Sequence, residues 1–445
     1  MMKRNFGKVE CLLAVALALG VPAFAQSSDS SAVIQDDSKL SFTLDEAKKY
    51  ALAHNRTIKN ASYDVQKSEA ARWKAIASML PQVSGNVGYN YFFDKKSTMK
   101  SGEMEFPISN PAYFEFGITA TATVSGSQIV GVKVSKIAEE LSQIGTGKTD
   151  QVITANVEKS YVNILALEKT KELLTRNLEN LNNLHKMTMN AVKAGAAEQN
   201  DADQIAVQVS SMNSALNQTS RGIEVLYNTI RLMTGAKPDA EIVLTQTLDD
   251  VVNPETILSL MGEDLSLSRN FDYLLKWKSL ELSDKQVTLS KMAYVPNLSL
   301  FYNYASKAFP GDEGMNMVPP HTVGFKLNVP IFSSGSRWAD VKSAKLDYEK
   351  ARNEMEDTEQ QLGIQARQLR YNLTSAYENF EIQSNNIGVM QRVFKSNTEK
   401  FKYGTISSMQ LTTSSTELVN AQNTYINALL DMVNAHVELR NLLNR

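Results

Sequence analysis

The stretch SGSQIVGVKVSK at Ser125–Lys136 is answered by SGSRWADVKSAK at Ser334–Lys345, an offset of 209 residues. In each copy a second glycine follows 69 residues after the first, at Gly195 and Gly404, directly after Lys-Ala or Lys-Tyr. A repeat without insertions over such a span indicates a duplicated structural unit. The two halves of the chain are therefore expected to have similar structures.

The interval between the two glycines has a helical period, which is clearest in the second copy. Apolar residues there step by three and four, and an extra step of four at Leu362 acts as a stutter in the heptad pattern. Helices are predicted over 133–193 and 337–402, and 69 residues rising 1.5 Å each make a rod of about 100 Å. A long dimeric coiled coil is the alternative from this stretch alone. The apolar series begins with Val341, Ala344, Tyr348, Ala351 and Met355.

Upstream of each long helix, apolar and polar residues alternate with a period of two. Strands are predicted at 82–93, 113–125, 296–305 and 322–332, with loops at 94–112 and 306–321. Alternating strands with aromatic residues near their ends are typical of outer-membrane barrels, although a soluble sheet with one wet face has the same pattern. Four strands cannot close a useful barrel, and open edges are not tolerated in lipid, so a membrane location would require several chains. The candidate lipid-facing residues are Val83, Val87, Tyr89, Tyr91, Phe114, Phe116, Ile118, Leu298, Leu300, Tyr302, Val323, Phe325 and Leu327.

Shorter helices complete each half. The first repeat, 26–235, holds a helix at 45–79, begun by a capping box of Thr43 and Glu46, and a return helix at 199–234. The second repeat, 264–445, holds helices at 264–294 and 408–443, and a connector spans 236–263. The upstream and return helices together are about as long as the long helix. Stacked end to end, they would lie antiparallel to it.

The N-terminus and the composition limit the possible functions. Residues 1–25 have a basic start, a ten-residue apolar segment and an Ala-Phe-Ala cleavage site, which predicts a secretory signal peptide. The one cysteine, Cys11, lies within it, so no disulfide, thiol nucleophile or cysteine metal site is expected afterwards. A formal charge of −2 without basic blocks gives no reason to expect nucleic-acid binding. No catalytic constellation, metal spacing or cofactor motif is present, so an enzyme is not expected.

An ordered set of junctions, present in duplicate, resembles the TolC-like outer-membrane factors of efflux and type I secretion systems. The matching segments cover about 42–444 and are Leu44-Asp45-Glu46-Ala47, Leu80-Pro81-Gln82-Val83, Val295-Pro296-Asn297-Leu298, Val329–Gly335 and the two Lys-x-Gly turns. The resemblance implies a mainly α fold with a membrane β-part. Three identical chains would form a twelve-strand β-barrel on a twelve-helix α-barrel.

The same resemblance implies an outer-membrane location with a long periplasmic extension. The expected partners are outer-membrane lipid, a periplasmic adaptor (membrane fusion protein) and an inner-membrane pump. The expected function is export of small molecules or drugs in a tripartite system. Type I protein secretion is the nearest alternative, and a periplasmic coiled-coil scaffold or adhesin is an alternative of a different class.

Two sets of residues at the tip follow from the resemblance. Acidic rings at the tip entrance attract cations in many relatives, which makes Glu198 and Asp201 candidates for an aperture, together with Gln410 and Thr413 where relatives often carry acids. Ordinary helix-start acids are the alternative for the first two. The candidate adaptor contacts are the turn residues Gly195, Ala196, Gly404, Thr405 and Ile406, with a plain helix reversal as the alternative.

Overall fold

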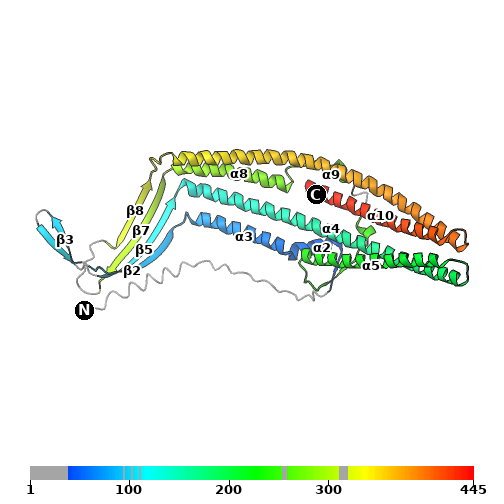
Figure 1. Cartoon of the computed structure of the whole chain (residues 1–445). Helices are drawn as coiled ribbons and strands as arrows, with labels where there is room; N and C mark the ends of the chain where they lie inside the picture. Colours follow the sequence, from blue (N-terminus) through cyan, green and yellow to red (C-terminus); the bar gives the residue numbers. More distant parts are fainter. Residues whose placement is uncertain are drawn as a thin grey trace.

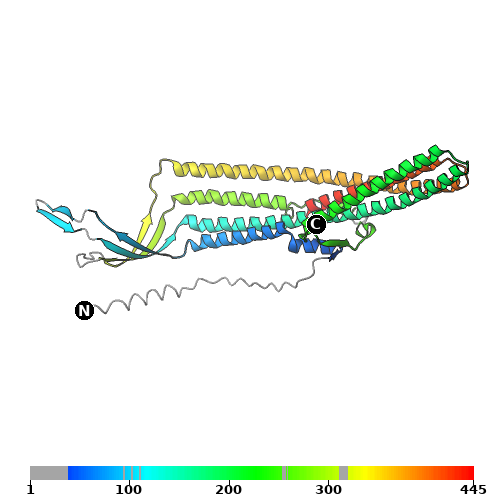
Figure 2. The same ribbon diagram turned by 60° about the horizontal axis from the view of Figure 1, so that its bottom comes forward.

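The protein is an elongated rod with a β-sheet at one end and, at the other end, two tight turns that each connect a pair of helices (Figures 1 and 2). The structure is a computed structural model that describes residues 39–93, 96–101, 104–109, 112–252, 257, 259–309 and 319–445. The predicted signal peptide lies outside the described residues. The C-terminus lies about midway along the rod, at the level that we call the equator (Figure 1).

The elements follow the duplicated order that the sequence indicates. The helices are α2 (Leu44–His54), α3 (Arg56–Ala77), α4 (Gly126–Lys193), α5 (Gln199–Thr234), α6 (Leu248–Val251), α8 (Phe271–Lys291), α9 (Ser336–Lys402) and α10 (Ser408–Leu443), with short 3₁₀ turns η1 (Leu260–Gly262) and η2 (Met292–Tyr294). The strands are β1 (Lys39–Phe42), β2 (Gln82–Asn90), β3 (Lys96–Ser101), β4 (Met104–Ser109), β5 (Tyr113–Val124), β6 (Glu241–Leu244), β7 (Asn297–Ala308) and β8 (His321–Asn328).

The predicted single helix over 45–79 is wrong, because the chain breaks at Asn55. The capping box of Thr43 and Glu46 begins α2 as predicted. Asn55 then takes an extended conformation (φ −61°, ψ 130°), and its side chain accepts hydrogen bonds from the N–H groups of Thr57 and Ile58. An asparagine in this role begins a new helix rather than continuing the old one.

The predicted starts of two other helices also need correction. The helix expected from 264 begins at Phe271, because Asn270 caps it with the same pair of bonds that Asn55 makes. The long helix expected from 133 begins at Gly126. There Ser125 and Gln128 form a capping box, which supplies partners for backbone N–H groups at the helix start.

The short helices stack end to end beside the long ones. The amide of Asn55 reaches the carbonyl of Met233 at the end of α5, so α3 continues the line of α5 along α4, and α2 lies beside their joint (Figure 1). Asn270 likewise reaches Leu442 at the end of α10, so α8 and α10 share one line between α4 and α9. The helices of the chain therefore form four rods in a layer.

Four strands make one antiparallel sheet in the order β2-β5-β7-β8. Two hairpins, β2 with β5 and β7 with β8, are joined through the β5–β7 pair. The last strand was expected to reach 332 but ends at Asn328. Pro330, which has no N–H for a ladder, follows shortly after. The strand expected at 296–305 runs three residues further, to Ala308.

The segment 94–112, expected to be a loop, contains a separate hairpin. Its strands β3 and β4 pair antiparallel from Lys96 with Ser109 to Ser101 with Met104. A connection of this length without structure of its own is uncommon in proteins. Pairing the two arms gives their backbone groups partners within the chain.

The equator contains a parallel strand pair that the sequence analysis missed. β1, from the segment before the first helix, pairs with β6 of the connector, and Tyr161 of α4 lies fully buried beneath them. The Tyr161 hydroxyl donates to the carbonyl of Phe42 at 3.0 Å. Strands of four residues carry too little pattern to be recognised from a single sequence.

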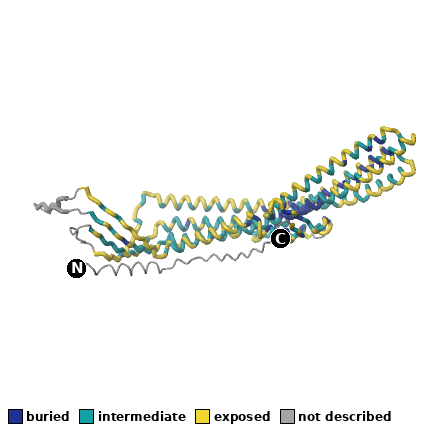
Figure 3. The backbone as a smooth tube through the Cα atoms, turned by 90° about the horizontal axis from the view of Figure 1, so that it is seen from below, coloured by how far each residue is buried: buried dark blue, intermediate teal, exposed yellow. Residues whose placement is uncertain are grey.

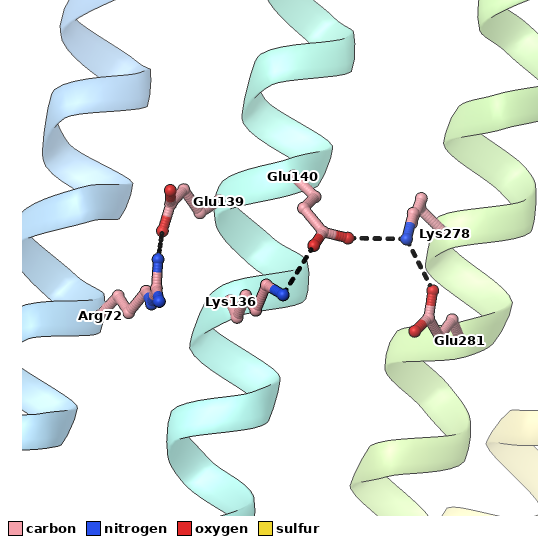
Figure 4. Close-up of polar contacts among 6 residues, drawn as sticks. All are labelled: Arg72, Lys136, Glu139, Glu140, Lys278 and Glu281. Atoms are coloured by element: carbon pink, nitrogen blue, oxygen red, sulfur yellow. Dashed lines mark hydrogen bonds and ion pairs between the residues drawn. The ribbon is translucent and has the colours of Figure 1, made fainter.

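Buried side chains concentrate at the equator and continue toward the tip, while the half of the rod next to the sheet is largely half-buried or exposed (Figure 3). In that half, α3 and α8 each bury one residue, Ile58 and Val287. Ion pairs join the helices there: Arg72 of α3 meets Glu139 of α4 at 3.2 Å (Figure 4). A layer only one helix thick, wet on both sides, is suited to the wall of a tunnel rather than to a globular core.

A second set of ion pairs in this half holds α8 to α4. Lys278 lies 2.6 Å from Glu140 and 2.9 Å from Glu281, and Lys136 approaches Glu140 from the other side (Figure 4). The hydrogen bond from Lys278 lowers the pKa of Glu140. The charge network therefore stays ionised at neutral pH and links adjacent rods in a half where few side chains are buried.

Candidate functional site

The sheet has one apolar face, which follows from its register. Residues directly opposite each other in adjacent antiparallel strands point to the same face. Val87 pairs with Phe116, Ile118 with Tyr304, and Leu300 with Phe325, so the apolar positions of all four strands coincide.

Every candidate lipid-facing residue is exposed in the single chain, from 38% for Tyr302 to 79% for Val323. Tyr91, which lies just beyond the end of β2, is 51% exposed. A continuous exposed apolar patch of this kind marks a protein or membrane contact surface. Among the described strand residues, this face carries no Asp, Glu, Lys or Arg.

Aromatic side chains gather at the end of the sheet remote from the helices. Tyr89 and Phe114 lie ring to ring at 4.8 Å across β2 and β5. On β7 and β8, the Tyr302 hydroxyl and His321 Nδ1 are hydrogen-bonded at 2.9 Å, and the rings of Tyr304 and His321 are 5.0 Å apart. Such amphipathic rings suit the water–lipid boundary of a barrel.

The opposite face of the sheet is polar. Ser84 pairs with Thr119, and the hydroxyl of Thr119 donates to Asn303 at 3.0 Å; Thr123 and Ser299 are bonded at the same distance. The two faces therefore differ clearly, with Tyr113 and Phe301 as aromatic exceptions on the polar face and Ser306 and His321 as polar exceptions on the apolar face.

The edges of this sheet, β2 and β8, have no strand partner on their outer sides within the described chain. Unpaired backbone groups are not stable in hydrocarbon, where no water replaces the missing bonds. The apolar face and the open edges are therefore compatible only if other strands complete the sheet.

The two tip turns have the same backbone geometry. Gly195 and Gly404 have φ values of +72° and +70°, and each turn closes with the two hydrogen bonds of a Schellman motif. Gly195, Ala196, Gly404 and Thr405 are exposed. These four predicted adaptor contacts are thus accessible at the end of the rod.

Ile406, the fifth predicted contact, is half-buried instead. It packs with Phe401 against a small core formed by Leu184, Ile205 and Leu411. A neighbouring cleft of about 270 Å³ runs between α4, α9 and α10 and is lined by Met187, Phe394 and others. Ile406 therefore holds the turn in place rather than presenting a free side chain.

The candidate aperture residues occupy equivalent positions at the starts of the two return helices. Glu198 stands where Ser407 stands in the other half, and Asp201 stands where Gln410 does. Ser407 caps its helix through the N–H of Gln410, whereas Glu198 makes no side-chain cap. Glu198, Gln410 and Thr413 are exposed and Asp201 is half-buried.

A buried charge cluster at the equator was not foreseen from the sequence. Glu158 of α4, with its side chain 8% exposed, receives two hydrogen bonds from Arg440 of α10, at 3.0 and 2.5 Å. Lys48 of α2 lies 2.6 Å away. Burial by itself raises the pKa of Glu158, but the Arg440 hydrogen bonds and the Lys48 charge outweigh it, so this pKa lies below its ordinary value.

His436 lies one helical turn before Arg440 beside this cluster. Burial and the charge of Arg440 lower its pKa, so the imidazole is neutral in the folded protein at neutral pH. The cluster joins the first half of the chain to the second. Its partners are distant in sequence, and no local pattern points to them.

The described residues lack two other features. No three His, Cys, Asp or Glu side chains come together in them in a way that would hold a metal ion. None of their helices is both long enough and apolar enough to cross a bilayer.

A sheet with an exposed apolar face and open edges, joined to a single layer of long helices, is the architecture of an outer-membrane channel-tunnel protein. The family model for outer membrane efflux proteins matches residues 49–236 and 264–445, and the chain belongs to this family. The resemblance inferred from the sequence is therefore confirmed. The family consists of channel proteins of the outer membrane, whose helices extend into the periplasm.

Individual relatives agree with this assignment. The chain is 23% identical over 296 residues to the pyoverdine export outer membrane protein OpmQ of Pseudomonas aeruginosa, a match that covers 66% of this chain and 62% of that protein. The match thus spans less than two thirds of the relative's length.

Solved structures share the fold. CusC is 15% identical with a TM-score of 0.74, covering 90% of this chain and 91% of its own. VceC of Vibrio cholerae is 14% identical with a TM-score of 0.73, covering 90% and 95%. The predicted fold class, long helices on a membrane β-part, is confirmed by these likenesses.

Proposed function

We propose that the protein works as a homotrimer, the outer-membrane conduit of a tripartite efflux system. The observation that carries the proposal is the combination of an exposed apolar sheet face with two open edges, β2 and β8. Three copies would contribute twelve strands and close the barrel, pairing β8 of each chain with β2 of the next. Closure would satisfy every backbone group in lipid.

The helical layer supports the same assembly. Four rods from each of three chains would make a twelve-rod wall continuous with the barrel. Exposed apolar side chains remain along the outer rods of the single chain, including Val225 on α5 and Ile364 and Tyr371 on α9. Contact between α9 of one copy and the α3/α5 rod of the next would bury side chains of this kind. The interior would be a water-filled path from the tip to the outside.

The tip turns are the proposed docking site for a periplasmic adaptor, which would couple the conduit to an inner-membrane pump. Ala196 and Thr405 are exposed on rigid turns at the end of the rod, and the small core behind them fixes their position. Arginine at either site would obstruct docking; at Thr405 it also removes the hydrogen bond from the hydroxyl to the Lys400 carbonyl, whereas Ala196 has no side-chain bond to lose. We expect export to be lost while the trimer and its conductance persist.

Small molecules are the proposed cargo. The relative OpmQ carries pyoverdine export in its name, which favours a small solute over a secreted protein for this chain too. Protein secretion remains an outcome that an export assay can reveal. Cells with the intact pump and adaptor should retain a fluorescent dye when this protein is deleted and clear it when the gene is returned.

Asp201 and Glu198 are the proposed ring of charge at the tip aperture. Three copies would place six carboxylates around a narrow entrance, which would favour cations. Gln410 and Thr413, neutral at the second turn, leave that ring to the first turn alone. The test is single-channel conductance of purified protein in planar bilayers, with Asp201→Asn and Glu198→Gln in parallel.

Small, cation-selective conductance that loses selectivity in the two variants is the expected result. A soluble periplasmic monomer without conductance would instead favour a coiled-coil scaffold or adhesin. Mass measurement in detergent provides the control for assembly, since the trimer must form before a conductance result is interpretable.

A further inference from the structure

The polar face of the sheet carries few charged residues, and they lie at its two ends. Within the described strands only Glu115, Lys307 and Lys326 are charged on this face. Glu115 and Lys307 are direct register partners at the outer end, where their charges compensate. Lys326 is opposite Ser299, at the end of the sheet next to the helices.

Lys326 is electrostatically isolated from the other pair. Ser299 and Lys307 are separated by eight residues of β7, about 27 Å at 3.4 Å per residue. Charges in water are largely screened beyond about 8 Å at physiological ionic strength. Glu115 therefore cannot neutralise Lys326, which is exposed and is the one charged residue at its level within the described strands of this sheet.

An aromatic ring lies in the next row of the same face. Phe301 is opposite Gly324, and a Cβ at Gly324 would come within 2.6 Å of the Phe301 Cζ atom. The Cζ end of the ring therefore occupies the space that a side chain at position 324 would fill, in the row of this face next to Lys326. Phe301 is the residue that interrupts the otherwise polar alternation of β7.

We infer that Lys326 and Phe301 form a collar inside the barrel that selects organic anions, solutes in which a carboxylate, sulfonate or phosphate group is joined to an apolar or aromatic body. The inference rests on the proposed trimer, in which the polar face lines the lumen and each chain contributes one lysine to a ring. Low-dielectric walls focus the field of such a ring on the path of the solute. The ring would attract the anionic group, and the three Phe301 rings would contact its apolar part.

The first test is the reversal potential of single trimers in a potassium chloride gradient. Lys326→Gln should shift it toward cation selectivity, and Lys326→Glu should shift it further. The measurement is made both in the natural sequence and with Asp201→Asn and Glu198→Gln, since acids at the tip act in series with the collar. Lys237→Gln, in the exposed connector at the equator, is the matched control. Unchanged reversal potentials in both backgrounds would overturn the inference.

A cysteine experiment tests the direction of the side chain. Cys11, in the predicted signal peptide, is the one native cysteine, so Lys326→Cys gives a single thiol in the mature chain. A thiol reagent carrying an ammonium group should restore the original selectivity, and one carrying a sulfonate should reverse it. Leu327→Cys, the next residue on the apolar face, should not respond. The opposite pattern would place Lys326 outside the lumen.

The role of Phe301 is tested with two blockers of equal charge. A naphthalene sulfonate should block the channel at a several-fold lower concentration than a short alkyl sulfonate, and Phe301→Ser should remove that difference without altering chloride selectivity. Equal block by both in the natural protein would remove Phe301 from the collar. Protein that never conducts would instead overturn the proposed channel itself, so the two failures are distinguishable.

Discussion

Asn55 and Asn270 make the same pair of contacts in the two halves of the chain. Each is buried and begins a helix with its side-chain oxygen. Each also donates its amide to the last turn of a return helix, Asn55 to the Met233 carbonyl at 2.6 Å and Asn270 to the Leu442 carbonyl at 2.9 Å. One side chain thus links two stacked helices at each joint.

Replacing either asparagine with alanine should destabilise the protein by about 2 kcal/mol, since a helix cap and a bond to a buried carbonyl are both lost. The stability of Asn55→Asp should lie between that of the natural protein and that of Asn55→Ala, because aspartate retains the capping oxygen but loses the amide donor. Thermal unfolding followed by circular dichroism measures the effect. Asn60→Ala, at an exposed site of α3, is the control. Equal melting temperatures for Asn55→Ala and Asn60→Ala would contradict the joint.

This joint also shows how far the sequence alone could go. Upstream of the long helices the repeat has an offset of 215 residues, which pairs Asn55 with Asn270. The break in the first helix was not predicted, because an asparagine within a helical pattern does not reveal whether its side chain caps or faces solvent. The apolar sheet face was predicted residue by residue, since a period of two fixes which side chains share a face. Glu158 was missed because its partner Arg440 is 282 residues away, and such contacts leave no local pattern.

Glu158→Gln should cost about 3 kcal/mol, because Arg440 and Lys48 would be left without their buried counter-charge. Glu438→Gln is the matched control. Glu438 also joins α10 to α4, through Lys159, but its side chain is 50% exposed, and such surface pairs contribute at most about 1 kcal/mol. The pKa of Glu158 is lowered on folding, so its stabilisation is present above the ordinary pKa of 4.5 and is lost as the pH falls below it. Equal losses in both variants would show that burial of the cluster is unimportant.

His436 should make the free energy of unfolding depend on pH in a second, separate range. Its pKa is lowered from 6.5 by burial and by Arg440. Well above pH 6.5 both the folded and the unfolded states hold a neutral ring. As the pH falls below that value, the unfolded state takes the proton first, so the free energy of unfolding decreases. His436→Gln should flatten the melting temperature across this range, while His185→Gln in α4 serves as the control. An identical slope in the natural protein and in His436→Gln would refute this role.

Gly235 and Gly195 should respond differently to alanine. Both have positive φ, +76° and +72°, which costs an alanine about 1 kcal/mol. At Gly195 a Cβ meets nothing within 4 Å, but at Gly235 it would lie 2.5 Å from the carbonyl oxygen of His54. Gly235→Ala must therefore move backbone and should lower the melting temperature clearly more than Gly195→Ala. Asn444, the equivalent residue in the second half, has a φ of +53°, and asparagine adopts this conformation more readily than alanine does. Gly235→Asn therefore keeps the clash of the Cβ with His54 but reduces the backbone strain, so comparison with Gly235→Ala separates the two effects. A similar loss of stability in Gly235→Ala and Gly195→Ala would argue against close packing of Gly235 on the backbone of His54.

Val323→Arg should prevent insertion into the outer membrane, whereas Thr322→Arg should not. The two residues are adjacent on β8, lie opposite Tyr302 and Asn303 near the middle of β7, and point to opposite faces. An arginine on the lipid face of a barrel costs about 2–4 kcal/mol near the bilayer midplane and less toward the membrane boundaries, and the cost is repeated in each of the three copies of a trimer. On the polar face the same side chain remains in water. The measurement is the amount of trimer in the outer-membrane fraction, with total expression as the reference. Insertion of both variants to the same level would mean that the apolar face does not meet lipid, and would remove the strongest support for a membrane barrel.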